Sequence, residues 1–273
     1  MKNLFSAALV AILCCTSCAA SPSSSVSENR TLSGKSFSAL SVNSAIEVTY
    51  VQSAKVDMKV SGPSDQLKDF SATVKDGVLR LSYDGRKANV KTIKVVLNAP
   101  SISSFEAGGA STIIVKQPVN ATDVTVTAHG ASDIKIPGCS ATQVTVSASG
   151  SSDVNLGSVL CDNFKTVASG SSDVDASALN CSTAAIEASG TSDVEIKGVQ
   201  VLTIDVNASG SSDVELAGKA GRANFNASGI STISSSRLAV NGGNASASGN
   251  SNIRCNIADL HQTSDHLSTI TNN

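Results

Sequence analysis

Five aspartates recur at one interval along the chain, and they are the residues best suited to bind an ion. They are spaced 20 residues apart: Asp133, Asp153, Asp173, Asp193 and Asp213. Carboxylate oxygens are ligands that Ca²⁺ prefers, so a ladder of them could hold calcium. Calcium-binding β-rolls, however, repeat about every nine residues, whereas this sequence offers one such Asp per 20 residues. We therefore favour a solvated polar edge and keep a calcium-dependent binding protein as the alternative.

Two of the seven cysteines share a phase of the same interval. Cys161 and Cys181 each lie eleven residues after a repeated glycine. If neighbouring repeats stack as strands of one sheet, their Cα atoms lie about 4.8 Å apart, within the range of about 4.4–6.8 Å that disulfides span. A disulfide between them is therefore predicted in an oxidising compartment. Cys255 falls on the inward parity and is predicted to be a buried free thiol, whereas Cys139 has no partner in phase and its state stays open.

The beginning of the chain has the features of a lipoprotein export signal. Lys2 precedes an apolar run at residues 4–13, and "CCTSC" follows it. The run is too short to span a membrane and is typical of a secretory signal peptide. The segment "CCTSC" resembles a lipobox, the cleavage site of bacterial lipoproteins, although Cys15 stands where Leu is usual. We expect residues 1–17 to be removed and Cys18 to carry the lipid that binds the membrane.

Few residues are placed to support catalysis. His129 lies close to Asp133, which allows a triad to be imagined, but no G-x-S-x-G motif accompanies them. Polysaccharide-active β-helix enzymes need paired carboxylates in a sugar-binding groove, and this chain has 3% aromatic residues and no Trp to form sugar platforms. His261 and His266 show no metal-ligand spacing. We expect no catalytic residues, no cofactor and no small-molecule substrate, and keep a polysaccharide-active enzyme as the third alternative.

The composition narrows the class of partner. Of the 273 residues 15% are charged, and the formal net charge is −2. Because average soluble domains carry about 25% charged residues, the surface must consist largely of Ser, Thr and Asn. The sequence contains no basic block of the kind that binds nucleic acid. A nucleic-acid partner is therefore excluded.

A fixed period organises the second half of the chain and must position these side chains. The phrase "ASGSSDV" or a close variant recurs, with its glycines 19–21 residues apart: Gly109, Gly130, Gly150, Gly170, Gly190, Gly210, Gly229 and Gly249. Such a period is typical of a solenoid. Within a unit, apolar or small residues alternate with polar ones, as in residues 144–156, and no helical pattern intervenes. The sequence predicts an all-β, single-stranded parallel β-helix with about 20 residues per coil.

The repeated phrase itself predicts a corner of each coil. At about 3.3 Å per residue, a coil has a perimeter near 66 Å and must bend more than once. Ala148, Gly150 and Ser152 are small residues on the inward parity, where side chains crowd at a bend. Glycine also accepts unusual backbone angles there. We expect the glycines to stack in a column at one corner, and the rarity of left-handed crossovers favours a right-handed coil.

The chain is predicted to contain one folded domain behind its export signal. Residues 18–35 are Ser-rich and nearly free of apolar side chains, which indicates a flexible tether. The domain covers residues 36–273. Its segment 36–105 forms an N-terminal β region or cap, and segment 106–253 forms the regular coils. A degraded last coil and tail are expected at 254–273, where His266 stands in place of glycine.

From about residue 36 to residue 270 the sequence resembles a known family, the putative auto-transporter adhesin head GIN domain of bacterial envelope proteins. The resemblance rests on "FSALSVNSAIEVTYVQ", "VKDGVLRLSYDG", "LNAPSISSFEAGGAST" and the repeated "ASGSSDV". It implies an extracytoplasmic β-helical module that is frequently carried on lipoproteins. It also implies a role in adhesion.

Together these observations predict a non-enzymatic envelope lipoprotein that serves as an adhesin, interaction or structural module. Its membrane partner is reached through Cys18, and its other partner is an envelope protein or glycan whose identity the sequence does not give. The expected location is the outer membrane of a bacterium, facing either the periplasm or the cell surface. Neither that facing nor the oligomeric state follows from the sequence.

Overall fold

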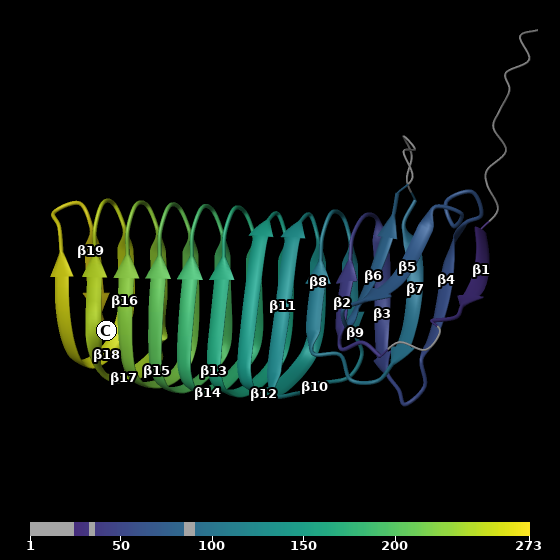
Figure 1. Ribbon diagram of the computed structural model, residues 1–273. Coiled ribbons are helices and arrows are strands. Elements are labelled where there is room, and N and C mark those ends of the chain that lie inside the picture. The colour runs from purple at the N-terminus through teal and green to yellow at the C-terminus, as the bar shows by residue number, and fades with distance from the viewer. Residues whose placement is uncertain (1–24, 33–35, 85–90) are drawn as a thin grey trace, which may run out of the picture.

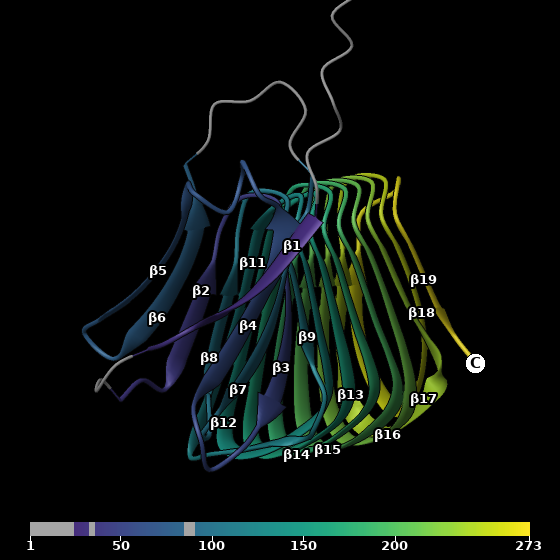
Figure 2. The same cartoon turned by 90° about the vertical axis from the view of Figure 1, so that its right-hand side faces the viewer.

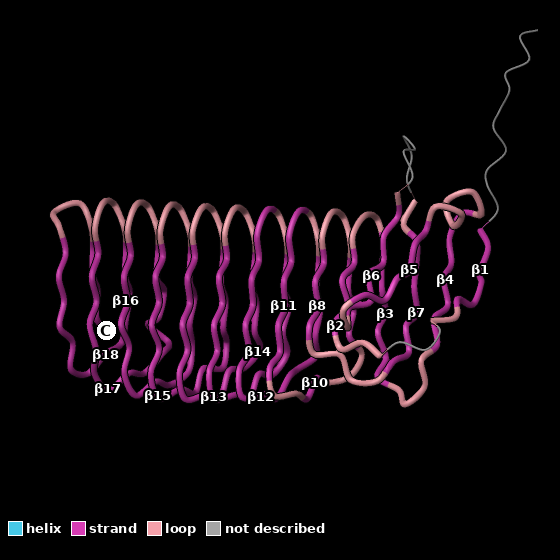
Figure 3. Tube along the Cα trace, viewed as in Figure 1, coloured by secondary structure: helices cyan, strands magenta, loops and turns pink. Residues whose placement is uncertain are grey.

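The computed structural model describes residues 25–32, 36–84 and 91–273, and all of its regular elements are β-strands (Figures 1 and 3). The strands of the N-terminal region are β1 (Ser25–Arg30), β2 (Ala39–Val42), β3 (Ile46–Gln52), β4 (Asp57–Pro63), β5 (Phe70–Lys75), β6 (Val78–Tyr83), β7 (Ile93–Ala99), β8 (Ser104–Ala107), β9 (Thr112–Val115) and β10 (Val119–Asn120). None of the described residues forms a helix, so none forms a helix able to span a membrane.

The regular coils follow as long strands that bend in their middle. They are β11 (Asp123–Gly130), β12 (Asp133–Gly150), β13 (Asp153–Ala168), β14 (Asp173–Ala188), β15 (Asp193–Ala208), β16 (Asp213–Ala227), β17 (Thr232–Ala247), β18 (Asn252–Ser264) and β19 (Thr269–Asn272). Each pairs in parallel with the next, and the pairing Asp133↔Asp153 shows an offset of 20 residues. The predicted parallel β-helix with about 20 residues per coil is confirmed.

The hand of the coil can be followed in the two ribbon views. The strand segments that lead up to the corner glycines run upward on the near side in Figure 1, and the chain returns down the far side while it advances from right to left. Figure 2 shows the same path from the N-terminal end, clockwise and receding. The coil is therefore right-handed, in line with the rule for crossovers between parallel strands.

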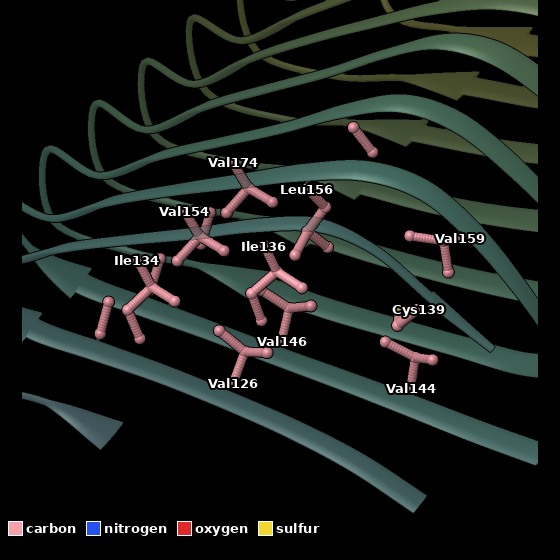
Figure 4. Packing of buried hydrophobic residues seen from close by; sticks show 14 of the residues in the cluster. Val126, Ile134, Ile136, Cys139, Val144, Val146, Val154, Leu156, Val159 and Val174 are labelled. Atoms are coloured by element: carbon pink, nitrogen blue, oxygen red, sulfur yellow. The ribbon is translucent and has the colours of Figure 1, made fainter. Parts of the chain in front are cut away.

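The interior is a stack of aliphatic side chains from alternate positions. Ile134, Val154 and Val174 occupy the same position in three successive coils and are at most 1% exposed (Figure 4). Their polar neighbours along the strand point outward, because successive side chains of a strand face opposite sides. One continuous core runs from the first coils to Ile257 in the last.

The corner at the repeated phrase depends on glycine. All eight repeated glycines have a positive φ, from 68° at Gly109 to 83° at Gly249. A Cβ added at Gly150 would lie 2.6 Å from the carbonyl oxygen of Gly130, so the column excludes side chains by contact as well as by backbone angle. The prediction is corrected in one detail: Gly150 is exposed, since the left-handed backbone turns it out of the interior, and only Ala148 and Ser152 are buried there.

The N-terminal region caps one end of the solenoid (Figure 2). Its strands β2, β3, β6 and β7 continue the parallel walls, whereas β4 and β5 pair antiparallel with β7 and β6. Residues 25–30, which the composition assigned to a flexible tether, instead form β1 and pair antiparallel with β4. Composition failed here because the ladder hydrogen bonds are made by the backbone, and the exposed edge strand needs few apolar side chains.

The last coil turns its corner without glycine. The pairing Asn252↔Thr269 places His266 in line with Gly249, as predicted, but His266 does not adopt a positive φ. Asp265 holds this turn instead: its carboxylate accepts the N–H of Gly249 at 2.7 Å and the hydroxyl of Ser268 at 2.6 Å. The hydroxyl of Ser268 has the largest effect on this carboxylate, followed by the backbone N–H of Gly249 and then those of Leu267 and Ser268. Together these donors lower the pKa of Asp265 to about 2.

Replacing Asp265 with Ala is expected to loosen the last coil and leave the others intact. The pKa of this carboxyl is lower in the folded chain than in the unfolded chain, so its stabilising effect is present above about pH 3.9 and is lost as the pH falls toward 2. Hydrogen exchange should therefore speed up at the amides of β19 in the variant at pH 7, while those of β14 keep their protection. Unchanged exchange in β19 would show that its backbone pairing alone holds the coil.

Candidate functional site

The five predicted aspartates form one ladder on the outside of the solenoid. Asp133, Asp153, Asp173, Asp193 and Asp213 are paired in register through four successive ladders. Each follows the corner glycine and donates its backbone N–H to the buried serine of the coil before, as Asp153 does to Ser132 at 2.9 Å. These backbone bonds set the side chains on the outer face, so the predicted outward placement is confirmed.

Around the ladder, carboxylates of adjoining positions widen it into an acidic face. Asp175, Glu195 and Glu215 stand two residues further along the strands, and with Asp173, Asp193 and Asp213 they line a hollow of about 340 Å³. Burial, followed by the neighbouring carboxylates, raises the pKa of Asp173 and of Asp175. Two cations lie at the margin: Lys197 pairs with Glu195 at 3.3 Å, and Arg237 pairs with Glu215.

This acidic face lacks the arrangement of a metal centre. Within the described ranges, no group of three or more His, Cys, Asp or Glu residues is arranged to hold a metal ion. The carboxylates stand in columns at the strand spacing and do not converge on one point, because each side chain points away from a flat sheet. The calcium alternative therefore rests on the charge of this face alone.

Replacing Asp153, Asp173 and Asp193 together with Asn is expected to leave the melting temperature unchanged or to raise it slightly at pH 7. The pKa of Asp173 is higher in the folded chain, so its contribution to stability is present below the unfolded pKa and is lost as the pH rises through the folded value. Calorimetry with and without millimolar Ca²⁺ measures the melting temperatures of the parent chain and of the variant. A rise of several degrees with Ca²⁺ in the parent chain, absent in the variant, would support the calcium alternative.

His129 and Asp133 have partners other than each other. His129 Nε2 lies 3.6 Å from Glu106 Oε1, and the ring covers Gly108. Asp133 instead accepts the hydroxyl of Thr112 at 3.4 Å. The imagined triad of His129 and Asp133 is therefore not formed. His261 and His266 are exposed in and after β18, at the far end of the solenoid from the cap.

A second candidate region lies at the opposite bend of the coils. A hollow of about 660 Å³ crosses β13 to β17 and has Cys161, Cys181 and Val201 on its floor. Asn180, Gln200 and Lys219 line it with polar groups. The sequence placed Cys161 and Cys181 in one phase, and the flanking pair Leu160↔Asn180 confirms that they occupy the same site of adjacent coils.

The four described cysteines are all free thiols and all buried. Cys255, as predicted, is fully buried. Burial raises the pKa of Cys139 to about 12, with a smaller effect from Cys161. The disulfide between Cys161 and Cys181 stays a prediction.

Mild oxidation is expected to link Cys161 to Cys181. Stacking sets their Cα atoms about 4.8 Å apart, and closing the loop between them should stabilise the fold by about 3 kcal/mol. Peptide mapping under non-reducing conditions would identify the bridge. A map in which Cys161 pairs with Cys139 instead would contradict the coil register.

The inward serines at the glycine corner form a hydrogen-bonded column, a role that their small size alone did not indicate. Ser132, Ser152, Ser172, Ser192, Ser212, Ser231 and Ser251 are buried to 2% exposure or less. Ser152 Oγ lies 3.2 Å from the carbonyl oxygen of Ala128 in the coil before and accepts the N–H of Ser149 at 3.1 Å. Each hydroxyl thus ties its corner to the neighbouring coil. A serine fixed two residues after every glycine was the available sign.

The predicted lipid-bearing Cys18 and the cleavage site before it lie outside the described residues. The first described strand, β1, begins at Ser25 and belongs to the cap end of the solenoid (Figure 1).

Comparison with solved structures finds the same fold in three bacterial proteins. A putative adhesin from Parabacteroides merdae is 17% identical with a TM-score of 0.63, over 91% of this chain and 96% of that chain. A putative lipid binding protein from Parabacteroides distasonis is 13% identical with a TM-score of 0.68, over 91% and 96%. A putative adhesin from the same organism is 17% identical with a TM-score of 0.63, over 92% and 94%. At these identities the likeness shows the fold alone.

No functionally curated protein matches the chain. A family model does, at residues 36–206 and again at 190–260, which together cover most of the cap and of the coils. The glycine column and the strands β2 to β10 fall within the matched residues, whereas β1 precedes them. The chain therefore belongs to the family described as "Putative auto-transporter adhesin, head GIN domain".

Proposed function

We propose that the protein is a non-enzymatic binding module of the bacterial cell envelope, attached to the outer membrane by lipid at Cys18. The observation that carries the proposal is the solenoid surface. Hydroxyl, amide and carboxylate side chains repeat on it at the strand spacing, as in Ser171 with Thr191 at 2.8 Å and Asn224 with Asn244 at 2.8 Å. A long regular surface of this kind suits contact with an extended envelope protein or glycan.

Membership of an adhesin-like family supports an envelope or surface location. The sequence before the domain supports the anchor, since "CCTSC" follows an apolar run of signal-peptide length. A non-enzymatic role is supported by the partners of His129 and Asp133, which contact Glu106 and Thr112 and not each other. These three lines are independent, so each part of the proposal can fail without the others.

The anchor is tested by metabolic labelling with a fatty acid. The wild-type chain should incorporate label, Cys18→Ala should lose it, and Cys14→Ala should keep it as the matched control. An unlabelled wild-type chain that is cleaved at another site would remove the anchor from the proposal.

Binding is tested by capture from an envelope extract on the immobilised reduced chain, with and without a calcium chelator. The expected result is a specific envelope protein or glycan that is retained in both conditions. Retention only without chelator, lost in Asp153→Asn/Asp173→Asn/Asp193→Asn, would replace the proposal with the calcium-dependent alternative. Capture no greater than that of an unrelated β-solenoid would contradict a binding role.

A further inference from the structure

The hollow at the second bend has two cysteine thiols among the side chains that line it. Cys161 and Cys181 are 7% and 6% exposed, and both line the floor of the hollow of about 660 Å³. Cys255, by comparison, is 0% exposed, and Cys139 is 4% exposed. Because a reagent reaches a buried sulfur only through an opening, Cys161 and Cys181 are the two thiols that a ligand in the hollow would meet.

The two sulfur atoms are held close together by the coil register. Leu160↔Asn180 and Asn163↔Thr183 pair on either side of the cysteines, which fixes both backbones. Because the two thiols interact, the pKa of Cys161 is lowered and the pKa of Cys181 is raised. Cys181 Sγ also lies 3.3 Å from the carbonyl oxygen of Thr183, so its orientation is restrained. The pair is therefore preorganised without any added ligand.

We propose that Cys161 and Cys181 form a two-coordinate binding site for a thiophilic monovalent metal ion of the Cu(I) class. Each thiol gives up one proton as its sulfur binds the ion, so one M⁺ and two neutral thiols yield a complex of charge −1 and two protons. No electron is transferred. Both cysteines line the same hollow, and their backbones lie on adjacent strands, about 4.8 Å apart, so one ion can contact both side chains.

The ligand set selects the class of ion. Thiolates are soft ligands that favour Cu(I), whereas structural Zn²⁺ takes about four ligands in a tetrahedron. The described residues offer no group of three or more His, Cys, Asp or Glu for such a site. Cys139 is a further buried thiol, but it is not among the residues that line the hollow with Cys161 and Cys181.

Two charged side chains should change the stability of the anionic complex. Lys219 lines the same hollow and would favour the charge of −1. Asp162 follows Cys161 in the sequence, and its negative charge would disfavour an anionic complex. Removing the charge of Lys219 should therefore weaken ion binding, and removing that of Asp162 should strengthen it.

The metal site belongs to the reduced pair, and a disulfide would abolish it. A bound ion should accordingly protect the pair: the reduced, loaded chain should resist mild oxidation that links Cys161 to Cys181 in the empty chain. Ion binding and disulfide formation therefore exclude each other. Resistance to oxidation gives a second readout of ion binding that does not depend on measuring affinity.

The test uses the reduced chain with Cys14, Cys15 and Cys18 replaced by Ser, so that the thiols of "CCTSC" do not compete for the ion. It is titrated anaerobically with Ag⁺, a redox-inert member of the class, and then with Cu(I) against a chromophoric competitor. The expected result is one ion per chain with release of two protons. Cys161→Ser and Cys181→Ser should each weaken binding at least 100-fold, and Cys255→Ser and Cys139→Ser should leave it unchanged. Circular dichroism checks that each variant is folded.

A shift of register provides the decisive control. Val201 pairs with Cys181 and lies on the same floor, 6% exposed. Cys161→Ser/Val201→Cys should therefore restore a thiol pair one coil further along and recover tight binding. The proposal is overturned if Cys161→Ser/Cys181→Ser still binds tightly, if Cys139→Ser weakens binding as much as Cys161→Ser, or if the folded register-shift variant does not bind.

Discussion

Replacing Gly190 with Ala is expected to lower the free energy of unfolding by about 4 kcal/mol or more, which is an unusually large effect for one methyl group. Two costs combine. The backbone at Gly190 has a φ of 79°, which costs an L-residue about 1–2 kcal/mol. The new Cβ would also lie 2.5 Å from the carbonyl oxygen of Gly170 and 3.0 Å from its nitrogen. Neither backbone atom can move without displacing a stacked coil.

Gly77→Ala is the matched control for this change. Gly77 has a φ of 75°, in the turn between β5 and β6, but a Cβ there would meet nothing within 4 Å. It should cost only the backbone strain, about 1–2 kcal/mol. Urea unfolding of both variants, followed by circular dichroism, measures the difference. Equal losses would show that the coils can separate to admit a side chain and that the column is not close-packed.

Replacing Phe225 with Ala is expected to cost about 3–5 kcal/mol. Phe225 is 1% exposed and shares its column with Val206 in the coil before and Ala245 in the coil after. Because Ala245 is small, nothing in the next coil can fill the space that the ring would leave. The surrounding strands are tied into continuous ladders, so the site cannot collapse readily.

Phe225→Leu keeps most of the volume and should cost about 1.5 kcal/mol or less. Thermal unfolding of both variants alongside the parent chain tests the contrast. Near-equal losses would mean that the shape of the ring, and not the volume of the side chain, determines the packing at this position.

The architecture could be predicted from the sequence because the repeat contains each structural constraint many times. The two-residue alternation predicted buried Val144 and Val146, and both are fully buried. The glycine interval predicted one corner per coil, and all eight glycines have positive φ there. The cysteine phase predicted that Cys161 and Cys181 lie in adjacent coils, which the ladder confirms. Where a sequence repeats, a single local rule applied to one coil settles the position of the same residue in every other coil.

The structures of the cap and of the last coil were harder to predict from the sequence because their residues do not follow the repeat. Nothing in the sequence of Ser25–Arg30 indicated β1, since its partner β4 lies some 30 residues away and the pairing is made by backbone groups. The role of Asp265 was likewise hidden: its carboxylate meets Gly249 only after the last coil has closed. One-off contacts of this kind leave no period to detect.

The sequence by itself determined the class of fold, the length of the coil, the inward and outward faces and the phase of Asp133–Asp213. These follow from local alternation and a fixed period, which depend on neighbours along the chain. Only the tertiary structure decided how the faces are shaped: that Asp173 and Asp175 share a hollow with carboxylates of later coils, and that Cys161 and Cys181 lie on the floor of another. The reason is physical. The register determines which residues stack. Whether a bend is open or filled depends on the combined volume of the side chains that five coils contribute to it. No single stretch of the sequence contains all of these side chains.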